Sequence, residues 1–310
     1  MEIFFYCNWI NNKDWLIEIK KKFKGWKILT LKDNPDLSKI KIAIVWQLPN
    51  QYYKKMKNIK LIFSLGAGVD HILNENAYNG ATVIRLKNKF MAERMANHVL
   101  SQVLIYQLHL KKYYNAQRKS KWINEIEPID NNKLTIGVLG LGYLGSAVGK
   151  KLHQLKYNVI GFKKSKPTKK YPYSIYHKYN DLKKFINKSD IIVNILPLTN
   201  QTRKIINKNF LKQMKKNSLI INVGRGSTIQ ESHLINHLND NKNFYAFLDV
   251  FEKEPLSKKN LLWNMPNVLV TPHVASLTPI RSSVEDMYEN LKQYSKNRKL
   301  LTDVNIKKGY

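Results

Sequence analysis

The sequence has 310 residues, enough for two domains of ordinary size, and 43% of them are hydrophobic, which indicates a globular protein. Its single cysteine, Cys7, excludes an intramolecular disulfide and fits a reducing compartment. No apolar run reaches the roughly 18 residues that a membrane span requires, and no basic leader precedes the first one, so we expect a soluble cytoplasmic protein with no membrane partner.

The charge is strongly positive, because 53 Lys and Arg residues face 22 acidic ones and leave a net charge of +31. Such an excess raises the possibility of nucleic-acid binding. The lysines are nevertheless spread along the whole chain, from "KKKFKGWK" to "KQMKKNS", whereas a nucleic-acid domain would concentrate them and add arginines and exposed aromatic residues. We interpret the charge as a lysine-rich amino-acid usage and expect no specific nucleic-acid partner.

Short apolar runs alternate with helical patterns along nearly the whole chain. Many runs are apolar on both faces, which is typical of parallel strands covered by helices on both sides. The predicted strands lie at residues 3–6, 41–46, 60–66, 81–86, 134–140, 158–163, 190–196, 218–224, 244–250 and 267–272. The alternation predicts an α/β fold with doubly wound sheets, and these strands are too many for one such sheet, so we expect two domains.

Two helical patterns are long. The first covers residues 92–114 and precedes a polar stretch, so we expect it to carry the chain from one domain into the other. The second covers residues 279–297 near the end of the sequence.

Three glycines, Gly140, Gly142 and Gly145, follow an apolar strand in the spacing G-x-G-x-x-G and open an amphipathic helix. The first permits a tight turn, the second lets a pyrophosphate approach the main chain, and the third lets helix and strand pack closely. Because the start of a helix favours an anion, the motif predicts dinucleotide binding, with Tyr143 and Leu144 also at the cofactor. The alternative is a tight strand–helix turn without a ligand.

The next strand ends at Phe162 and is followed by Lys163, Lys164, Ser165 and Lys166. An NAD-preferring site usually has an Asp or Glu there to bind the ribose 2′-hydroxyl. Three cations and a hydroxyl suit a 2′-phosphate instead, so we predict a preference for NADPH, with NADH as a possible substitute. The alternative is that these lysines only reflect the composition of the chain.

Three later strands are followed at once by polar residues, in "INVGRGS", "LDVFEKEP" and "TPHVAS". Ligands bind at the carboxyl ends of strands in open α/β sheets, so Arg225, Glu254 and His273 are expected to converge. Arginine offers a planar fork to a carboxylate, histidine exchanges a proton near neutral pH, and a carboxylate beside it holds its tautomer. Alternatively, His273 only closes a strand.

Together these motifs resemble the D-2-hydroxyacid dehydrogenase family, essentially from end to end. The resemblance rests on "LGAGVDHI" (65–72), the glycine motif, "LPLTNQT" (196–202), "NVGRGS" (222–227), "LDVFEKEP" (248–255) and "TPHVAS" (271–276). Within the family, "IVWQLP", "HVLSQVL" and "KKGY" look most like the bacterial A-type branch, which reduces glyoxylate and hydroxypyruvate.

The resemblance implies a role for each matching residue. His273 matches the proton donor, Glu254 its hydrogen-bonded partner, and Arg225 the group that binds the substrate carboxylate and carbonyl. Asp249 matches the acid that contacts the nicotinamide amide. The remaining implied residues are Trp46, Ala67, Gly68 and Val69 at the substrate, and Leu196, Pro197 and Val223 at the cofactor; no metal is implied.

The resemblance also implies the architecture and the reaction. A Rossmann coenzyme domain of residues 99–275 is inserted in a flavodoxin-like substrate domain of residues 1–98 and 276–310. The implied reaction is the NADPH-dependent reduction of glyoxylate to glycolate and of hydroxypyruvate to D-glycerate, in a homodimer. The alternatives are another specificity on the same scaffold, such as that for D-lactate, and a dinucleotide-sensing binding protein like the related transcriptional corepressors.

Two further residues, Asn97 and Glu252, bear on the predicted site. Asn97 stands where many relatives have a glutamate, and we expect a local change in the helix and no loss of chemistry. Glu252 lies two residues before Glu254 and is the alternative partner for His273, but we expect it to be a solvated loop residue.

Overall fold

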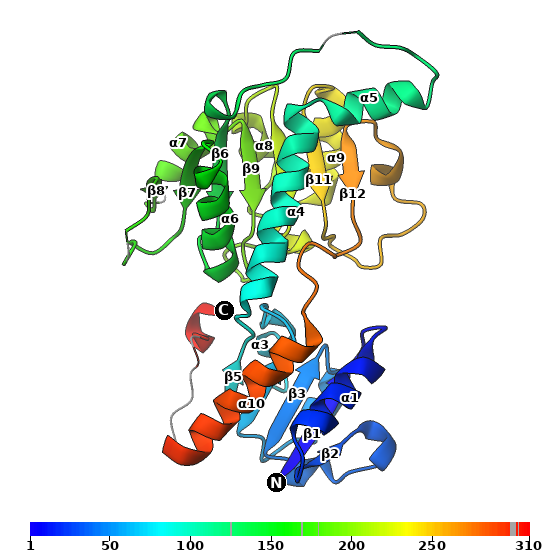
Figure 1. Ribbon diagram of the computed structural model, residues 1–310, viewed down its shortest axis with the longest axis vertical. Coiled ribbons are helices and arrows are strands. Elements are labelled where there is room, and N and C mark those ends of the chain that lie inside the picture. Colours follow the sequence, from blue (N-terminus) through cyan, green and yellow to red (C-terminus); the bar gives the residue numbers. More distant parts are fainter. Residues whose placement is uncertain (125, 169, 179, 298–301, 303) are drawn as a thin grey trace. The chain divides into compact units, whose positions relative to one another are not determined.

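The structure, a computed structural model, describes residues 1–124, 126–168, 170–178, 180–297, 302 and 304–310. The chain forms two compact units, a small unit of Met1–Phe90 with Thr278–Tyr310 and a large unit of Met91–Leu277 (Figure 1). The first boundary lies before the expected position after residue 98, because Met95, Val99 and Val103 pack in the core of the large unit. The helix that carries them, α4 (Lys89–Gln107), therefore goes with that unit almost whole.

The small unit contains a five-stranded sheet in the order β2-β1-β3-β4-β5, in which every pairing is parallel. This is the flavodoxin-like order, as predicted. Its strands are β1 (Glu2–Cys7), β2 (Lys27–Leu29), β3 (Ile42–Trp46), β4 (Leu61–Ser64) and β5 (Thr82–Ile84). Its helices are α1 (Asn12–Lys22), α2 (Asn50–Tyr53), α3 (Asp70–Leu73) and α10 (Ile280–Asn297).

The large unit contains a seven-stranded parallel sheet in the order β12-β11-β10-β9-β6-β7-β8. The strands are β6 (Thr135–Leu139), β7 (Asn158–Phe162), β8 (Ser174–Tyr176), β9 (Ile191–Asn194), β10 (Leu219–Asn222), β11 (Tyr245–Leu248) and β12 (Val268–Val270). The chain runs from β6 outward to β8 and then returns to β9 and runs outward to β12. The direction of strand addition therefore reverses between β6 and β9, where open α/β sheets bind their ligands.

Helices cover both faces of this sheet. Its strands are buried on both sides, so that Ile191 packs in one core cluster and Ile192 in the other. The first face is covered by α4 and α6 (Tyr143–Gln154), which lie in front of the sheet in Figure 1. The second is covered by α7 (Asp181–Lys188), α8 (Lys208–Gln213) and α9 (Glu231–Asp240). This double coverage explains why the strand sequences are apolar without alternation.

The predicted strands are all confirmed, and so is the helix at 279–297. Two strands of three residues, β2 and β8, were not predicted, because neither contains a long apolar run. The single helix predicted for 92–114 is wrong: α4 ends at Gln107 and α5 (Leu110–Gln117) follows, since His109 adopts a left-handed conformation with φ of 56° that interrupts the helix. Within the described residues, no helix is long and apolar enough to cross a membrane.

Candidate active site

The predicted cofactor and catalytic residues of the large unit follow the carboxyl ends of its strands. Because all these strands are parallel, the loops that follow them share one edge of the sheet. The loops carry Gly140–Gly145 after β6, Lys163–Lys166 after β7, Leu196 and Pro197 after β9, Val223 and Arg225 after β10, Asp249 and Glu254 after β11, and His273 after β12.

The glycine turn after β6 has the features that a pyrophosphate requires. Gly140 has a φ of 108°, which favours glycine, and a Cβ on Gly145 would lie 1.9 Å from the carbonyl oxygen of Gly140. A Cβ on Gly142, in contrast, would meet nothing within 4 Å. No side chain caps α6 at Gly142, so the turn leaves room for an anion at the start of this helix. The residues present therefore fit a dinucleotide.

The loops after β6, β7 and β9 are in contact with one another. A Cβ on Gly140 would lie 3.0 Å from the carbonyl oxygen of Ile195, and the Lys164 ammonium donates a hydrogen bond to the side chain of Gln201. The main chain of Lys163 is anchored by its N–H, which donates to the Tyr176 carbonyl at 3.0 Å. Gln201 was not singled out from the sequence, because its approach to Lys164 depends on the sheet order.

The predicted pair of His273 and Glu254 is present. Nδ1 of His273 lies 2.7 Å from Oε2 of Glu254, whose Oε1 accepts the main-chain N–H of Phe251 at 2.9 Å. Burial alone would raise the pKa of the Glu254 carboxyl, but its hydrogen bond to His273 and the nearby charges of His273 and Arg225 lower it below its usual value. Glu254 is therefore an anion at neutral pH, and the other ring nitrogen of His273, Nε2, remains for proton transfer.

The loop that carries His273 is held by Asp249. His273 has a φ of 55°, unusual for a residue with a side chain, and its N–H donates to the Asp249 carbonyl oxygen at 2.8 Å. The buried Asp249 carboxylate accepts the N–H groups of Val274 and Ala275, each at 2.9 Å, and the Thr271 hydroxyl at 2.6 Å. The structure thus gives Asp249 a positioning task that the sequence did not indicate, and its contact with nicotinamide stays a prediction.

Arg225 lies on a loop whose main chain is fixed by buried polar side chains. Its carbonyl oxygen accepts the Thr228 hydroxyl at 2.6 Å and the Asn222 amide at 3.3 Å, and Asn194 donates to both of these side chains. The next residue, Gly226, packs so closely that a Cβ would lie 1.8 Å from the carbonyl carbon of Phe251. This contact holds the Arg225 loop against the loop that carries Glu254.

In the small unit, the predicted substrate residues lie at the carboxyl ends of β3 and β4. Trp46 is buried, and its ring fills the space beside Gly66, where a Cβ would lie 2.5 Å from the indole. Among the described residues, no acceptor is found for the main-chain N–H groups of Ala67, Gly68 and Val69. These three donors suit an anionic ligand.

Glu252 and Asn97 each contact a lysine. Glu252 is exposed, and its carboxylate lies 4.0 Å from the Lys204 ammonium, so it is a loop residue as expected and does not partner His273. Asn97 accepts a hydrogen bond of 2.7 Å from Lys151 of α6, which ties α4 to α6.

Known proteins resemble this chain in sequence. Residues 100–275 match the family described as D-isomer specific 2-hydroxyacid dehydrogenase, NAD binding domain. The chain is 30% identical over 316 aligned positions to glyoxylate/hydroxypyruvate reductase A of Yersinia enterocolitica, with all of both chains covered. It is also 30% identical, again over the whole of both chains, to the protein of the same name from Photorhabdus laumondii.

Solved structures also resemble the whole chain. One is a D-isomer specific 2-hydroxyacid dehydrogenase from Xanthobacter autotrophicus in complex with NADPH and MES, with 32% identity, a TM-score of 0.91, and 100% of this chain and 99% of that chain covered. The other is an NADPH-dependent glyoxylate/hydroxypyruvate reductase from Sinorhizobium meliloti in complex with NADP and sulfate, with 28% identity, a TM-score of 0.92 and the same coverage.

Proposed function

The chain belongs to the D-isomer specific 2-hydroxyacid dehydrogenase family of NAD(P)-dependent oxidoreductases, and we propose that this member reduces glyoxylate to glycolate and hydroxypyruvate to D-glycerate with NADPH. The observation that carries the proposal is the His273–Glu254 pair, with 2.7 Å between Nδ1 and Oε2, on the loops that follow β12 and β11. The names of the relatives from Yersinia and Photorhabdus support these two substrates.

In the proposed reaction, the bound cofactor would supply a hydride to the carbonyl carbon of the 2-oxo acid. The carbonyl electron pair moves to its oxygen, and His273 protonates that oxygen from Nε2. The Glu254 carboxylate stabilises the positive charge that the imidazole carries before the transfer. The products are the 2-hydroxy acid and the oxidised cofactor.

We assign the carboxylate end of the substrate to two groups. Arg225 offers a planar fork that can bind a carboxylate oxygen and the carbonyl oxygen together. The N–H groups of Ala67, Gly68 and Val69 offer main-chain donors for the same carboxylate, because no acceptor in the described chain occupies them. With the substrate held this way, the carbonyl would be oriented before the transfer begins.

The preference for NADPH follows from the loop after β7. Lys164, Ser165 and Lys166 are exposed there and Lys163 is half-buried, so a 2′-phosphate would meet cations and a hydroxyl. The structures from Xanthobacter and Sinorhizobium are complexes with NADPH and NADP, which supports the same choice. The residues that would hold the rest of the cofactor are Gly140, Gly142, Tyr143, Leu144, Gly145, Leu196, Pro197, Val223 and Asp249.

The proposal is tested by following the loss of NADPH absorbance with a panel of 2-oxo acids that includes glyoxylate, hydroxypyruvate and pyruvate. We expect glyoxylate and hydroxypyruvate to give the highest kcat/KM. A higher value for pyruvate would identify a D-lactate type of specificity on the same scaffold.

A binding protein that senses dinucleotides is the second candidate, and the net charge of +31 is the observation that favours it. We expect only weak, salt-sensitive and sequence-independent DNA binding, because scattered lysines give a diffuse field that is screened within about 8 Å at physiological salt. Tight binding of one DNA sequence at that salt, together with no turnover of any 2-oxo acid, would favour the binding protein.

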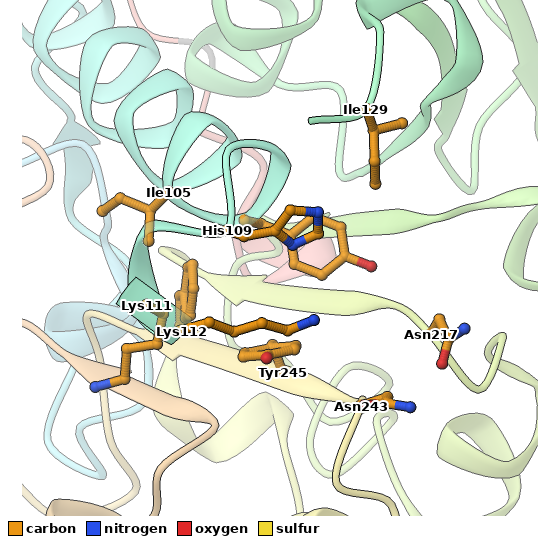
Figure 2. A pocket seen from close by; sticks show the side chains of 10 residues that line it. Ile105, His109, Lys111, Lys112, Ile129, Asn217, Asn243 and Tyr245 are labelled. Atoms are coloured by element: carbon orange, nitrogen blue, oxygen red, sulfur yellow. The ribbon is translucent and has the colours of Figure 1, made fainter. Parts of the chain in front are cut away.

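We further propose that the chain forms a homodimer through the end of α4 and the segment that follows it. Trp122 is 93% exposed, and Leu108, Leu110, Tyr114 and Ile123 of the same segment are exposed as well. A pocket of about 210 Å³ includes residues from the end of α4 and the start of α5; it is lined by Ile105, Tyr106, His109, Lys111, Lys112, Ile129, Asn217, Asn243, Tyr245 and Phe247 (Figure 2). Several exposed apolar side chains on one segment are typical of a protein interface.

The dimer is tested by light scattering of the wild-type protein and of Trp122→Asp. We expect a dimer that the substitution converts to a monomer, while Trp263→Asp, at another exposed tryptophan of the large unit, leaves the dimer intact. A monomeric wild-type protein would contradict the proposal.

A further inference from the structure

We propose that Ser64 and His71 are positioning residues that aim the main-chain N–H groups of Ala67 and Val69 at the substrate carboxylate. This inference rests on the proposed function, because it concerns how the loop of the small unit binds a 2-oxo acid. Neither residue needs to touch the substrate. Each acts through the conformation of the loop between them.

The protonation of His71 follows from its hydrogen bonds. The main-chain N–H of Gln47 donates to Nδ1 of His71 at 3.1 Å, and a main-chain N–H can only donate. Nδ1 therefore carries no hydrogen, which leaves the hydrogen of the neutral ring on Nε2. Nε2 lies 3.0 Å from the hydroxyl oxygen of Ser64, so the imidazole donates to Ser64.

The hydroxyl of Ser64 in turn donates a hydrogen bond to the loop. Ser64 is fully buried at the end of β4, and its oxygen also accepts the N–H of Gly66 at 3.3 Å. With two donors on its oxygen, the hydroxyl hydrogen is directed to the carbonyl oxygen of Gly68, at 2.8 Å. The relay thus runs from Gln47 through His71 and Ser64 to Gly68.

Hydrogen bonds fix the orientation of two carbonyl groups in the loop. The carbonyl oxygen of Gly66 accepts the N–H of Leu86 at 3.2 Å, and that of Gly68 accepts the Ser64 hydroxyl. A trans peptide group is planar, so its N–H points opposite to its C=O. The N–H of Ala67 therefore points away from Leu86, and the N–H of Val69 points away from Ser64. The hydrogen bonds thereby fix the direction of these two N–H groups, which we assign to the two oxygens of one carboxylate.

Packing holds the imidazole where the relay requires it. The rings of His71 and Trp46 have their centroids 4.3 Å apart, and Trp46 also packs against Trp9 with centroids 4.7 Å apart. Gln47, which donates to His71, adopts a φ of 50° and accepts the Asn8 amide through its side chain at 2.6 Å. Trp46 thus packs against both the imidazole of His71 and the loop, since its indole also fills the space beside Gly66.

The test compares Ser64→Ala, His71→Phe and the double variant with the wild-type enzyme. His71→Phe keeps a ring against Trp46 but removes both nitrogens. The loop binds the carboxylate in the ground state and in the transition state alike, so we expect KM for glyoxylate to rise about five- to tenfold while kcat changes less than twofold. Because both residues act through the Gly68 carbonyl, the double variant should have nearly the KM of the worse single variant.

Ser189→Ala is the matched control. Ser189 is also fully buried, and its hydroxyl donates at 2.8 Å to the carbonyl of Phe185, four residues away, in the large unit. We expect this variant to lose comparable stability without any change in KM for glyoxylate. A KM in Ser64→Ala within twofold of the wild-type value, or an equal loss of kcat and NADPH affinity, would overturn the positioning role.

Binding of oxalate, measured by calorimetry, separates this inference from the proposed function. If the wild-type enzyme reduces no 2-oxo acid but binds oxalate, and Ser64→Ala weakens that binding five- to tenfold, the positioning role stands and the proposed function fails. If the enzyme reduces glyoxylate and Ser64→Ala binds oxalate as the wild type does, the positioning role fails alone. Absence of oxalate binding to the wild type would also overturn it.

Discussion

Asp249 holds His273 in a left-handed main-chain conformation, because its carbonyl oxygen accepts the N–H of His273 at 2.8 Å while its carboxylate accepts the next two N–H groups at 2.9 Å each. A strained conformation at the residue that we propose as proton donor persists only where its surroundings hold it. The carboxylate of Asp249 thus fixes the main chain that positions the imidazole of His273.

We predict that Asp249→Asn lowers both stability and kcat. The amide would place an NH₂ group against a main-chain N–H of Val274 or Ala275, which leaves a buried donor without its acceptor and costs about 1–3 kcal/mol. The free energy of unfolding in urea and kcat for glyoxylate measure the two effects. Asp240→Asn, at an exposed position, is the control, and an Asp249→Asn variant as stable as this control would contradict the prediction.

We predict that Glu254→Gln lowers kcat and changes how stability depends on pH. The pKa of Glu254 is lowered in the folded protein, so its contribution to stability is complete above its usual value of 4.5 and disappears as the pH falls through the lowered value. The difference in unfolding free energy between wild type and Glu254→Gln should therefore be constant above pH 4.5 and shrink below it. Glu252→Gln should show no such difference, and a difference that grows on acidification would refute the assignment.

We predict that His273→Ala lowers kcat by roughly 10²- to 10⁴-fold, because general acid catalysis contributes about that much. The dissociation constant of NADPH, measured by fluorescence titration, should stay within about twofold of the wild-type value, since the imidazole is not assigned to the cofactor. A variant that keeps more than half of the wild-type kcat, under conditions where chemistry limits the rate, would remove His273 from the role of proton donor.

We predict that Arg225→Lys lowers kcat/KM for glyoxylate far more than it lowers the affinity for NADPH. Lysine keeps the positive charge but loses the planar fork that can bind a carboxylate oxygen and a carbonyl oxygen together. Steady-state kinetics with both substrates check this, with Arg281→Lys at an exposed position of α10 as the control. An unchanged kcat/KM would mean that Arg225 serves only the structure of its loop.

We predict that NADPH exceeds NADH in kcat/KM by at least about tenfold, because one net charge-assisted contact of about 1.4 kcal/mol suffices for that factor. Lys163→Asp combined with Lys164→Ala should narrow or invert the ratio. Lys54→Asp combined with Lys55→Ala changes the net charge equally in the small unit and should leave the ratio unchanged. A wild-type preference for NADH would show that these lysines are only part of the general composition.

Local patterns in the sequence were sufficient for much of the fold. Parallel strands buried on both faces need continuous apolar runs, so each longer run was recognisable by itself. The glycine turn was equally readable, since Gly140 needs a positive φ and Gly145 permits a close approach of helix and strand. The strands β2 and β8 were missed, because three residues carry too little pattern, and the break at His109 depends on one dihedral angle that no composition requires.

The sequence by itself also determined which residue types stand at the carboxyl ends of the strands, and so it identified Arg225, Glu254 and His273. Only the tertiary structure decided how they are held. The 2.7 Å contact of His273 with Glu254, the hydrogen bonds from residues 273–275 to Asp249 and the hydrogen bond from Gln47 to His71 all join groups on different segments of the chain. Hydrogen bonds depend on tenths of an ångström, and those distances arise only when the strands that carry the loops are paired in register.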